Sequence, residues 1–439
     1  MNAHIRGGGT GGVSRRDLLA LGAAALPAGL LFGSRAGAQD FTQTPLPPEA
    51  ARSDPLHPFW DKLPAEFPLR DGLIYFNTGG LGIPPLAVLQ RLQDVALEVA
   101  TKGETLRDKY FEPARAAVAR LVEAEPAEIA LTRNATEAMN LVARGLGLRR
   151  GDEVILTTHE HPGGAVPWVA LAQDLGVELR LFDPSFDPGR DAEAIWSLAT
   201  RRTRAVAISH LLCTVGYVMP VREICAEARR RGLWTVVDGA QAAGCLPLRL
   251  HDLGPDAYVA SGHKWLLGPE ETGFLYVRRE ALAQVTPRFA GAYSDRLDGY
   301  SLEERRLHYR DDASKFEYGT RSAAQVAGLA AALEWIDALG LDLVQARSTA
   351  LARRLHAGLA ALPGIEVLTP AAPAVAAPLV TFRVTRRPNT QVADWLRSEL
   401  GMRVRPVGER GLDAVRVSTH LVNRVADVDW LIEAARVLA

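Results

Sequence analysis

The sequence has 439 residues, of which 48% are hydrophobic and 23% charged; this composition is typical of a globular protein and excludes a fibrous or wholly disordered chain. Its 50 Lys and Arg residues against 51 Asp and Glu residues leave a formal charge of −1, so no nucleic-acid partner is expected. The three cysteines, Cys213, Cys225 and Cys245, form no CxxC pair, and we predict buried free thiols and no metal centre.

The first 38 residues have the pattern of an export signal. The pair Arg15-Arg16 precedes the uncharged run Leu18–Phe32, and Ala36-Gly37-Ala38 follows as a small-residue cleavage site. The paired arginines and the Ala-rich run resemble a twin-arginine signal, which implies export of the folded protein to the periplasm. Because the run is shorter than the ~20 residues that span a bilayer, we predict no stable membrane insertion after the signal is removed.

The pattern from residue 86 onward predicts a large α/β domain, residues 86–325. Short apolar runs alternate with stretches of helical periodicity, as in βαβ units around a mostly parallel sheet. Seven strands are expected at Glu128–Leu131, Glu153–Thr157, Glu178–Phe182, Ala205–Ser209, Leu233–Val237, Ala257–Ala260 and Phe274–Val277. Helices are expected at Ala135–Arg144, Gly164–Leu175, Ala192–Ala199 and Val221–Arg231.

Two further parts flank this domain. Residues 39–85 are rich in proline at their start and are expected to form an extended segment along the surface. Residues 326–439 are expected to form a linking helix, which begins near Ser322 and runs through Leu339, and a smaller α+β domain. Its strands are expected at Ile365–Leu368, Val380–Val384, Met402–Pro406 and Ala414–Ser418, and its later helices at Thr390–Leu400 and Val425–Leu438.

Polar residues that can carry chemistry follow two of the predicted strands. Asp238 comes at the end of one apolar strand, and Lys264 follows the end of the next. Ligands of open parallel sheets bind beyond these strand ends. A buried lysine loses its proton readily and suits Schiff-base chemistry with an aldehyde, and a nearby carboxylate suits the ring nitrogen of pyridoxal phosphate (PLP). A structural ion pair between Asp238 and Lys264 is the alternative.

The spacing Asp238-x-x-Gln241, followed by Ser261-x-His263-Lys264, resembles the class V aminotransferase family of fold-type I PLP-dependent enzymes. Cysteine desulfurases and isopenicillin N epimerase belong to this family. The resemblance implies that Lys264 binds PLP covalently, that Asp238 holds the pyridine nitrogen and that Gln241 contacts the phenolic oxygen. Ser261 and His263 would contact the phosphate.

Three further segments extend the resemblance. Ala135 and Thr136 open a helix directly after a strand, where backbone N–H groups favour a phosphate. His161 matches the family histidine that stacks on the cofactor ring, whereas His159 is expected in a surface loop. Thr320, in a segment that resembles one reaching the partner subunit's phosphate, implies a homodimer with shared sites.

Arginines of the small domain are candidates for binding a substrate carboxylate. Arg416-Val417-Ser418 with Asn423 resembles a family element whose arginine clamps the carboxylate in a bidentate way. Arg405 is a second candidate. The alternative for both is a solvated surface position.

Two departures from the family bear on the reaction. Cysteine desulfurases carry a nucleophilic cysteine in the loop that corresponds to Val407–Val415, which contains no cysteine here; desulfuration by that route is disfavoured. Glu271 stands where relatives commonly have glycine, so a positive φ there would strain the backbone.

The product of the reaction is left open by the sequence. The family's common chemistry is removal of the α-proton of an amino acid, with Lys264 as the base. We expect aminotransferase-like chemistry, with an epimerase like isopenicillin N epimerase or a C–S lyase as alternatives. Gly79-Gly80 and Gly163-Gly164 suggest a roomy pocket, and Tyr217 or Tyr318 is a candidate second acid. A non-catalytic, exported ligand-binding protein is the alternative from another class.

Overall fold

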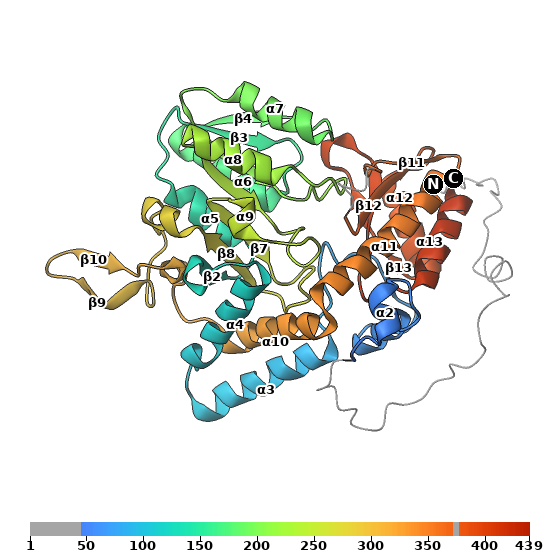
Figure 1. The fold of residues 1–439 in the computed structure, drawn as a ribbon, viewed down its shortest axis with the longest axis horizontal. Coiled ribbons are helices and arrows are strands. Elements are labelled where there is room, and N and C mark those ends of the chain that lie inside the picture. Colours follow the sequence, from blue (N-terminus) through green and yellow to red (C-terminus); the bar gives the residue numbers. More distant parts are fainter. Residues whose placement is uncertain (1–44, 372–376) are drawn as a thin grey trace, which may run out of the picture.

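The computed structural model describes residues 45–371 and 377–439. The export signal expected in residues 1–38 lies outside these residues, so export to the periplasm stays a prediction. In the described part of the chain, no helix combines the length and the apolar character needed to cross a membrane. A large α/β domain and a smaller C-terminal domain follow the N-terminal segment (Figure 1).

A seven-stranded sheet forms the centre of the large domain. In spatial order its strands are β2 (Ile129–Thr132), β8 (Gly273–Val277), β7 (Ala257–Ser261), β6 (Trp234–Asp238), β5 (Thr203–Ser209), β3 (Glu153–Thr157) and β4 (Glu178–Phe182). Only β8 runs antiparallel to its neighbours, β2 and β7. The mostly parallel sheet is confirmed, and each predicted strand lies within two residues of the observed bounds.

Both faces of this sheet are buried, which explains the near-continuous apolar runs of its strands. Ile155 and Val206 belong to the core on one face, and Val154 and Ala205 to the core on the other. The connecting helices are α5 (Ala135–Gly145), α6 (Pro162–Leu175), α7 (Pro188–Leu198), α8 (Val221–Arg231) and α9 (Leu250–Leu253). Because β3, β5, β6 and β7 are parallel, their carboxyl ends meet at one edge of the sheet.

A layer of long helices connects the large domain to the rest of the chain. The linking helix α10 (Ala323–Leu339) packs against α3 (Leu86–Lys102) and α4 (Arg107–Leu121) (Figure 1). The side chain of Ser322 caps α10 by accepting a hydrogen bond from the N–H of Gln325 at 3.3 Å. Short 3-10 helices lie at η2 (Pro126–Glu128), η3 (Arg279–Gln284) and η4 (Ala313–Phe316).

In its described residues, the small domain has a four-stranded antiparallel sheet and three α-helices. Its elements are α11 (Leu341–Ala360), β11 (Ile365–Val367), β12 (Leu379–Val384), α12 (Asn389–Leu400), β14 (Arg405–Val407), η6 (Glu409–Gly411), β15 (Ala414–Ser418) and α13 (Val425–Leu438), with sheet order β11-β12-β15-β14. The prediction of a single strand at Met402–Pro406 is wrong. The segment divides into β13 (Met402–Arg403), which pairs with β1 (Ile74–Tyr75), and β14, which pairs with β15.

The N-terminal segment is less extended than expected. It contains α2 (Glu49–Ser53) and η1 (Trp60–Glu66) as well as β1. Trp60 and Leu63 are buried in one cluster with Trp335 of α10, so the segment contributes to the hydrophobic core instead of lying on the surface. Its later residues lead from β1 into the edge of the large sheet where the parallel strands end.

A hairpin of β9 (Asp295–Ser301) and β10 (Arg306–Tyr309) projects from the large domain (Figure 1). These two strands were not expected from the sequence. Leu297 and Tyr300 are exposed, so the hairpin lacks the buried apolar face that makes a strand recognisable from its sequence.

Glu271 adopts the positive φ that its position in the family pattern suggested. Its φ is +55° in the loop between β7 and β8, and its side chain is exposed. A left-handed backbone costs an L-residue about 1–2 kcal/mol. Glycine avoids this cost, but its greater conformational freedom in the unfolded chain lowers the stability of the folded state by about 0.4–1 kcal/mol. We expect Glu271→Gly to raise the free energy of unfolding by up to about 1 kcal/mol, measured by urea denaturation. Glu270→Gly, at a neighbour without positive φ, is the control and should lower it.

Candidate active site

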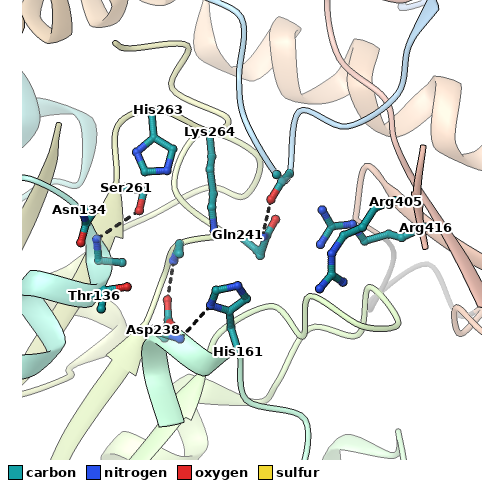
Figure 2. A pocket seen from close by; sticks show the side chains of 15 residues that line it. Asn134, Thr136, His161, Asp238, Gln241, Ser261, His263, Lys264, Arg405 and Arg416 are labelled. Carbon is teal, nitrogen blue, oxygen red and sulfur yellow. Dashed lines mark hydrogen bonds between the residues drawn. The ribbon is translucent and has the colours of Figure 1, made fainter. Parts of the chain in front are cut away.

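A cavity of about 280 Å³ opens where the parallel strands end (Figure 2). It is lined by Gly79, Gly80, Asn134, Ala135, Thr136, His161, Gly163, Asp238, Ala240, Gln241, Ser261, His263, Lys264, Arg405 and Arg416. The fold therefore brings together every expected cofactor- and substrate-binding residue except Thr320. The glycine pairs at 79–80 and 163–164 also border or approach this space, as predicted.

Lys264 and Asp238 enter the cavity from neighbouring strands. Asp238 is the last residue of β6, and Lys264 follows β7 by three residues. Both side chains are buried, and burial lowers the pKa of Lys264 and raises that of Asp238. Within the described residues, no ion pair of 4.0 Å or less joins the two, and no hydrogen bond engages Nζ of Lys264. The structural ion pair considered as an alternative is therefore not formed.

The carboxylate of Asp238 is held by the turn that follows it. Its Oδ1 accepts a hydrogen bond from the N–H of Ala240 at 2.8 Å. A Cβ atom on Gly164 would lie 2.9 Å from Oδ2, so glycine leaves the space beside this oxygen free. One carboxylate oxygen is thus fixed by the protein, and the other faces open space.

His161 presents a neutral imidazole to the cavity. It is the N-cap of α6, and its Nδ1 accepts a hydrogen bond from the N–H of Gly163 at 3.0 Å (Figure 2). Burial, with Lys264 and the two cavity arginines, lowers its pKa to about 4. The expectation that His159 lies in a surface loop is wrong: His159 is buried, with Nδ1 2.7 Å from Oγ1 of Thr214.

Gln241 is held at two points on the opposite side of the cavity. Its Nε2 donates to the carbonyl of Gly79 at 2.7 Å, and its Oε1 accepts from Nε1 of Trp265 at 3.0 Å. The second N–H of the amide stays available for a ligand. These contacts also join the N-terminal segment to the turn after β6.

Hydrogen-bond donors gather at the end of the cavity formed by the start of α5. Asn134 caps this helix by accepting from the N–H of Glu137 at 2.9 Å. The N–H of Ala135 donates to Oγ of Ser261 at 3.1 Å, which leaves the serine hydroxyl proton free to point elsewhere. Thr136 lines the same end, and Nδ1 of His263 is buried without a partner. This set of donors at a helix N-terminus suits an anion.

Two arginines close the cavity from the small domain. Arg416 on β15 and Arg405 on β14 lie opposite each other in register. Arg416 is only 2% exposed; its Nη1 donates to the carbonyl of Cys213 at 3.1 Å and its Nη2 to Oδ1 of Asn77 at 3.3 Å. Burial and the neighbouring Arg405 lower the pKa of Arg416 to about 10, so it stays charged at neutral pH.

Two polar residues beside the site, Asn77 and Glu160, were not expected from the sequence. Asn77 lies in the N-terminal segment, where it forms a parallel bridge with Ser418 of β15 and contacts Arg416. The carboxylate of Glu160 accepts from the hydroxyls of Thr157 and Ser209, each at 2.6 Å. Burial raises the pKa of Glu160 to about 7, and nearby Asp238 adds to this effect. The position of Glu160 directly before His161 was the available signal.

Asn423 and the two candidate second acids lie outside the cavity lining. Asn423 donates from Nδ2 to the carbonyl of Tyr75 at 2.9 Å and so holds β1 in place. Tyr217 is fully buried, and the hydroxyl of Tyr318 donates to Glu137 at 3.3 Å. Neither tyrosine is positioned as the second acid that the sequence suggested.

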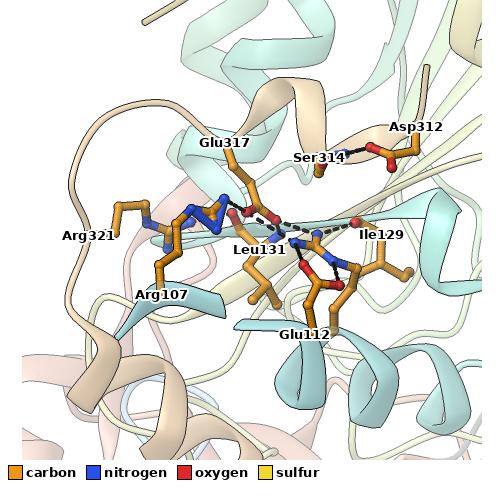
Figure 3. A network of polar contacts seen from close by, with 9 residues as sticks. Arg107, Glu112, Ile129, Leu131, Asp312, Ser314, Glu317 and Arg321 are labelled. Carbon is orange, nitrogen blue, oxygen red and sulfur yellow. Dashed lines mark hydrogen bonds and ion pairs between the residues drawn. The ribbon is translucent and has the colours of Figure 1, made fainter. Parts of the chain in front are cut away.

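Thr320 is exposed and is not part of the cavity of its own chain. The segment before it is anchored by Glu317, whose carboxylate accepts from Arg107 and Arg115, each at 2.5 Å, and from the N–H of Leu131 at 2.8 Å (Figure 3). The anchor presents Thr320 on the surface of the chain. Its contact with a partner subunit stays a prediction.

Comparison with known proteins identifies the family. The family described as aminotransferase class-V matches residues 85–431. A probable cysteine desulfurase of Xylella fastidiosa is 33% identical over 330 residues, which cover 71% of this chain and 78% of that protein. Isopenicillin N epimerase of Amycolatopsis lactamdurans is 31% identical over 399 residues, which cover 87% and 98%.

Solved structures have the same fold. The cystine C-S lyase C-DES, in a lysine variant with glycine covalently linked to its PLP cofactor, aligns with a TM-score of 0.79 and 29% identity and covers 85% of this chain and 98% of that one. Cysteine desulfurase from Thermococcus onnurineus aligns with a TM-score of 0.76 and 27% identity over 86% and 97%. The fold is that of the fold-type I PLP enzymes, and the chain belongs to the class V aminotransferases, a family of PLP-dependent enzymes.

Proposed function

We propose that this protein acts at the α-carbon of an amino acid through PLP bound to Lys264, with aminotransferase-like chemistry. One observation carries the proposal: the free, buried amine of Lys264 shares a cavity with the buried carboxylate of Asp238 and the buried guanidinium of Arg416. Lys264 and Asp238 form no ion pair of 4.0 Å or less in the described residues, and the cavity that both of them line has a volume of about 280 Å³.

The residues present fit this cofactor. Nδ1 of His263 is a buried polar atom without a partner, beside the donors at the start of α5 that suit a phosphate. A Cβ atom on Gly163 would lie 2.4 Å from Oγ1 of Thr136, and one on Gly164 would lie 2.9 Å from Oδ2 of Asp238. A side chain at either position would therefore crowd Thr136 or Asp238, and glycine leaves the space beside these two cavity-lining residues open. When bound, PLP supplies an aldehyde that reacts with amines and a ring that accepts electrons from the α-carbon.

Each side chain of the cavity has a role in this proposal. Ser261, His263 and Thr136 bind the phosphate group through N–H and O–H donors, beside Ala135, whose own N–H is directed to Oγ of Ser261. Oδ2 of Asp238 would accept a hydrogen bond from the protonated pyridine nitrogen, the neutral ring of His161 would stack on the cofactor, and the amide of Gln241 would donate to its phenolic oxygen.

Lys264 and Arg416 act on the substrate. Burial favours the neutral amine of Lys264, which suits removal of the proton from the α-carbon. Arg416 binds the α-carboxylate through its guanidinium, a planar donor that matches a carboxylate in a bidentate way. Its contacts with Cys213 and Asn77 fix its orientation, so the α-carbon is presented in one geometry.

Two other outcomes at the α-carbon remain as alternatives. Epimerisation is supported by the match to isopenicillin N epimerase, which covers 98% of that protein. A C–S lyase activity is supported by the likeness to C-DES. Desulfuration through the family's loop cysteine is disfavoured, because residues 407–415 contain no cysteine.

We also propose a homodimer in which Thr320 binds the phosphate group in the partner's site. Its exposure and the anchored segment before it support this arrangement. Export to the periplasm by the twin-arginine route is proposed on the sequence of residues 1–38 alone. Export after folding would allow cofactor loading in the cytoplasm.

The reaction is tested by incubating the cofactor-loaded protein with a panel of L-amino acids in deuterated water. We expect conversion of the cofactor to its pyridoxamine form, which indicates transamination. Deuterium at the α-carbon, together with loss of its L configuration and retention of the amino group, indicates epimerisation. Release of pyruvate with sulfide or persulfide indicates a lyase. No α-proton exchange with any amino acid would contradict the proposal and favour a ligand-binding protein.

A further inference from the structure

The loop between β14 and β15 places a carboxylate beside the two cavity arginines. Arg405 lines the cavity, and its Nη2 donates to Oε1 of Glu409 in this loop. This is the stretch in which cysteine desulfurases carry their nucleophile, and here it contains Glu409 instead. The loop therefore differs from those enzymes in a residue that can act on the substrate's side chain.

The loop is held in place from both domains. Arg410, the next residue, donates from Nη2 to Oδ1 of Asp183 at 3.0 Å, just beyond β4 of the large domain. Partial burial favours the neutral acid, but the backbone N–H of Glu409 and the guanidinium of Arg405 lower its pKa below the ordinary value. Glu409 is therefore a fixed, charged group at neutral pH.

The two arginines consequently differ in charge balance. Within the described residues, Arg416 forms no ion pair and donates only to neutral oxygens, those of Cys213 and Asn77. Arg405 is neutralised by Glu409, although its Nη1 is buried without a partner. The small-domain side of the cavity thus offers one uncompensated positive charge and one neutral pair that retains a free donor.

We propose that Glu409 determines the substrate class: by occupying Arg405, it restricts the site to amino acids with a single carboxylate and an uncharged side chain. This inference rests on the proposed function, in which Arg416 binds the α-carboxylate. The free Nη1 of Arg405 donates to a neutral acceptor in the side chain, such as a carbonyl or hydroxyl oxygen. A second carboxylate would have to displace Glu409 from Arg405.

The test measures binding of two unreactive anions, propionate and glutarate, to the cofactor-loaded protein by isothermal titration calorimetry. The wild type should bind them with affinities within about threefold of each other, because only Arg416 is available. Glu409→Gln should bind glutarate about tenfold more tightly, as expected for one added charge-assisted contact, and should change propionate binding by less than about threefold.

Two variants complete the design. The gain for glutarate should disappear in Arg405→Gln/Glu409→Gln, because the gain depends on the freed guanidinium. Glu366→Gln removes the same charge from an ion pair with Arg383 at 2.7 Å outside the cavity lining, and it should leave both affinities unchanged. Thermal unfolding confirms that all variants fold.

Three results would overturn the proposal. These are a wild type that already prefers glutarate about tenfold, an equal gain for both anions in Glu409→Gln, and a gain that persists in the double variant. Uptake of PLP, measured by its absorption, tests the proposed function independently of the anion titrations. A protein that takes up no cofactor contradicts that function, while the titrations still compare Arg405 with and without its carboxylate.

Discussion

Lys264→Ala is expected to abolish covalent attachment of PLP and to lower the rate of α-proton exchange by at least about 10³-fold. In the proposed function this amine both binds the aldehyde and takes the proton, and no other lysine lines the cavity described here. Borohydride reduction followed by peptide mapping should place the cofactor on Lys264 in the wild type. The variant should be unlabelled and colourless, and unchanged colour would contradict the assignment.

The chain contains its own control for this experiment. Lys315 is also buried, and burial lowers its pKa as well. Its Nζ donates to the carbonyls of Leu282 and Val285, at 2.5 and 2.9 Å, so its amine is engaged and lies away from the cavity. Borohydride should leave Lys315 unmodified, because burial alone does not make a lysine reactive.

The unfolding temperature of Lys264→Ala shows whether lost activity reflects the missing amine or a misfolded protein. Burying an ammonium group costs free energy, and Lys264 has neither an ion pair nor a hydrogen bond at Nζ within the described residues. The cofactor-free Lys264→Ala protein should therefore unfold at a temperature no lower than the cofactor-free wild type. A large drop in that temperature would mean that lost activity reflects lost structure.

The central sheet could be predicted from the sequence because its strands are buried on both faces. Strands such as β3 and β6 are largely apolar and end in polar residues, and their residues face cores on both sides. Asp238 and Lys264 could be predicted as site residues for a related reason: charged side chains are rarely buried at the ends of such strands unless they are paired or functional. The helix α8 matched its predicted bounds, with arginines in its last turn.

Features that depend on distant pairing could not be predicted. The division of residues 402–406 into two strands requires β1, more than 300 residues earlier, to pair with β13. Asn77 reaches Arg416 through another distant pairing, its bridge with Ser418 of β15. The pairing of Arg405 with Glu409 is local, but its importance is visible only once β14 and β15 place both arginines on one cavity.

Glu317→Ala is expected to have the largest effect on stability. Its carboxylate is buried and accepts hydrogen bonds from Arg107, Arg115 and the N–H of Leu131, with Arg321 close by (Figure 3). Removing it leaves the buried guanidinium of Arg115 with the neutral carbonyl of Ile129 at 2.8 Å and with exposed Glu112 at 3.3 Å as its remaining carboxylate. Loss of one partner from a buried ion pair costs about 3–5 kcal/mol, so the urea midpoint should fall strongly.

Glu112→Ala is the matched control, because Glu112 is the second carboxylate on the same arginine but is 63% exposed. Exposed ion pairs contribute about 0–1 kcal/mol, so this variant should lose little stability. Equal losses in the two variants would show that burial of Glu317 is not what matters. Glu317 also anchors the segment that presents Thr320 in the proposed dimer. The dimer of Glu317→Ala should therefore dissociate into monomers at higher protein concentrations than the dimer of Glu112→Ala. Analytical ultracentrifugation measures this difference.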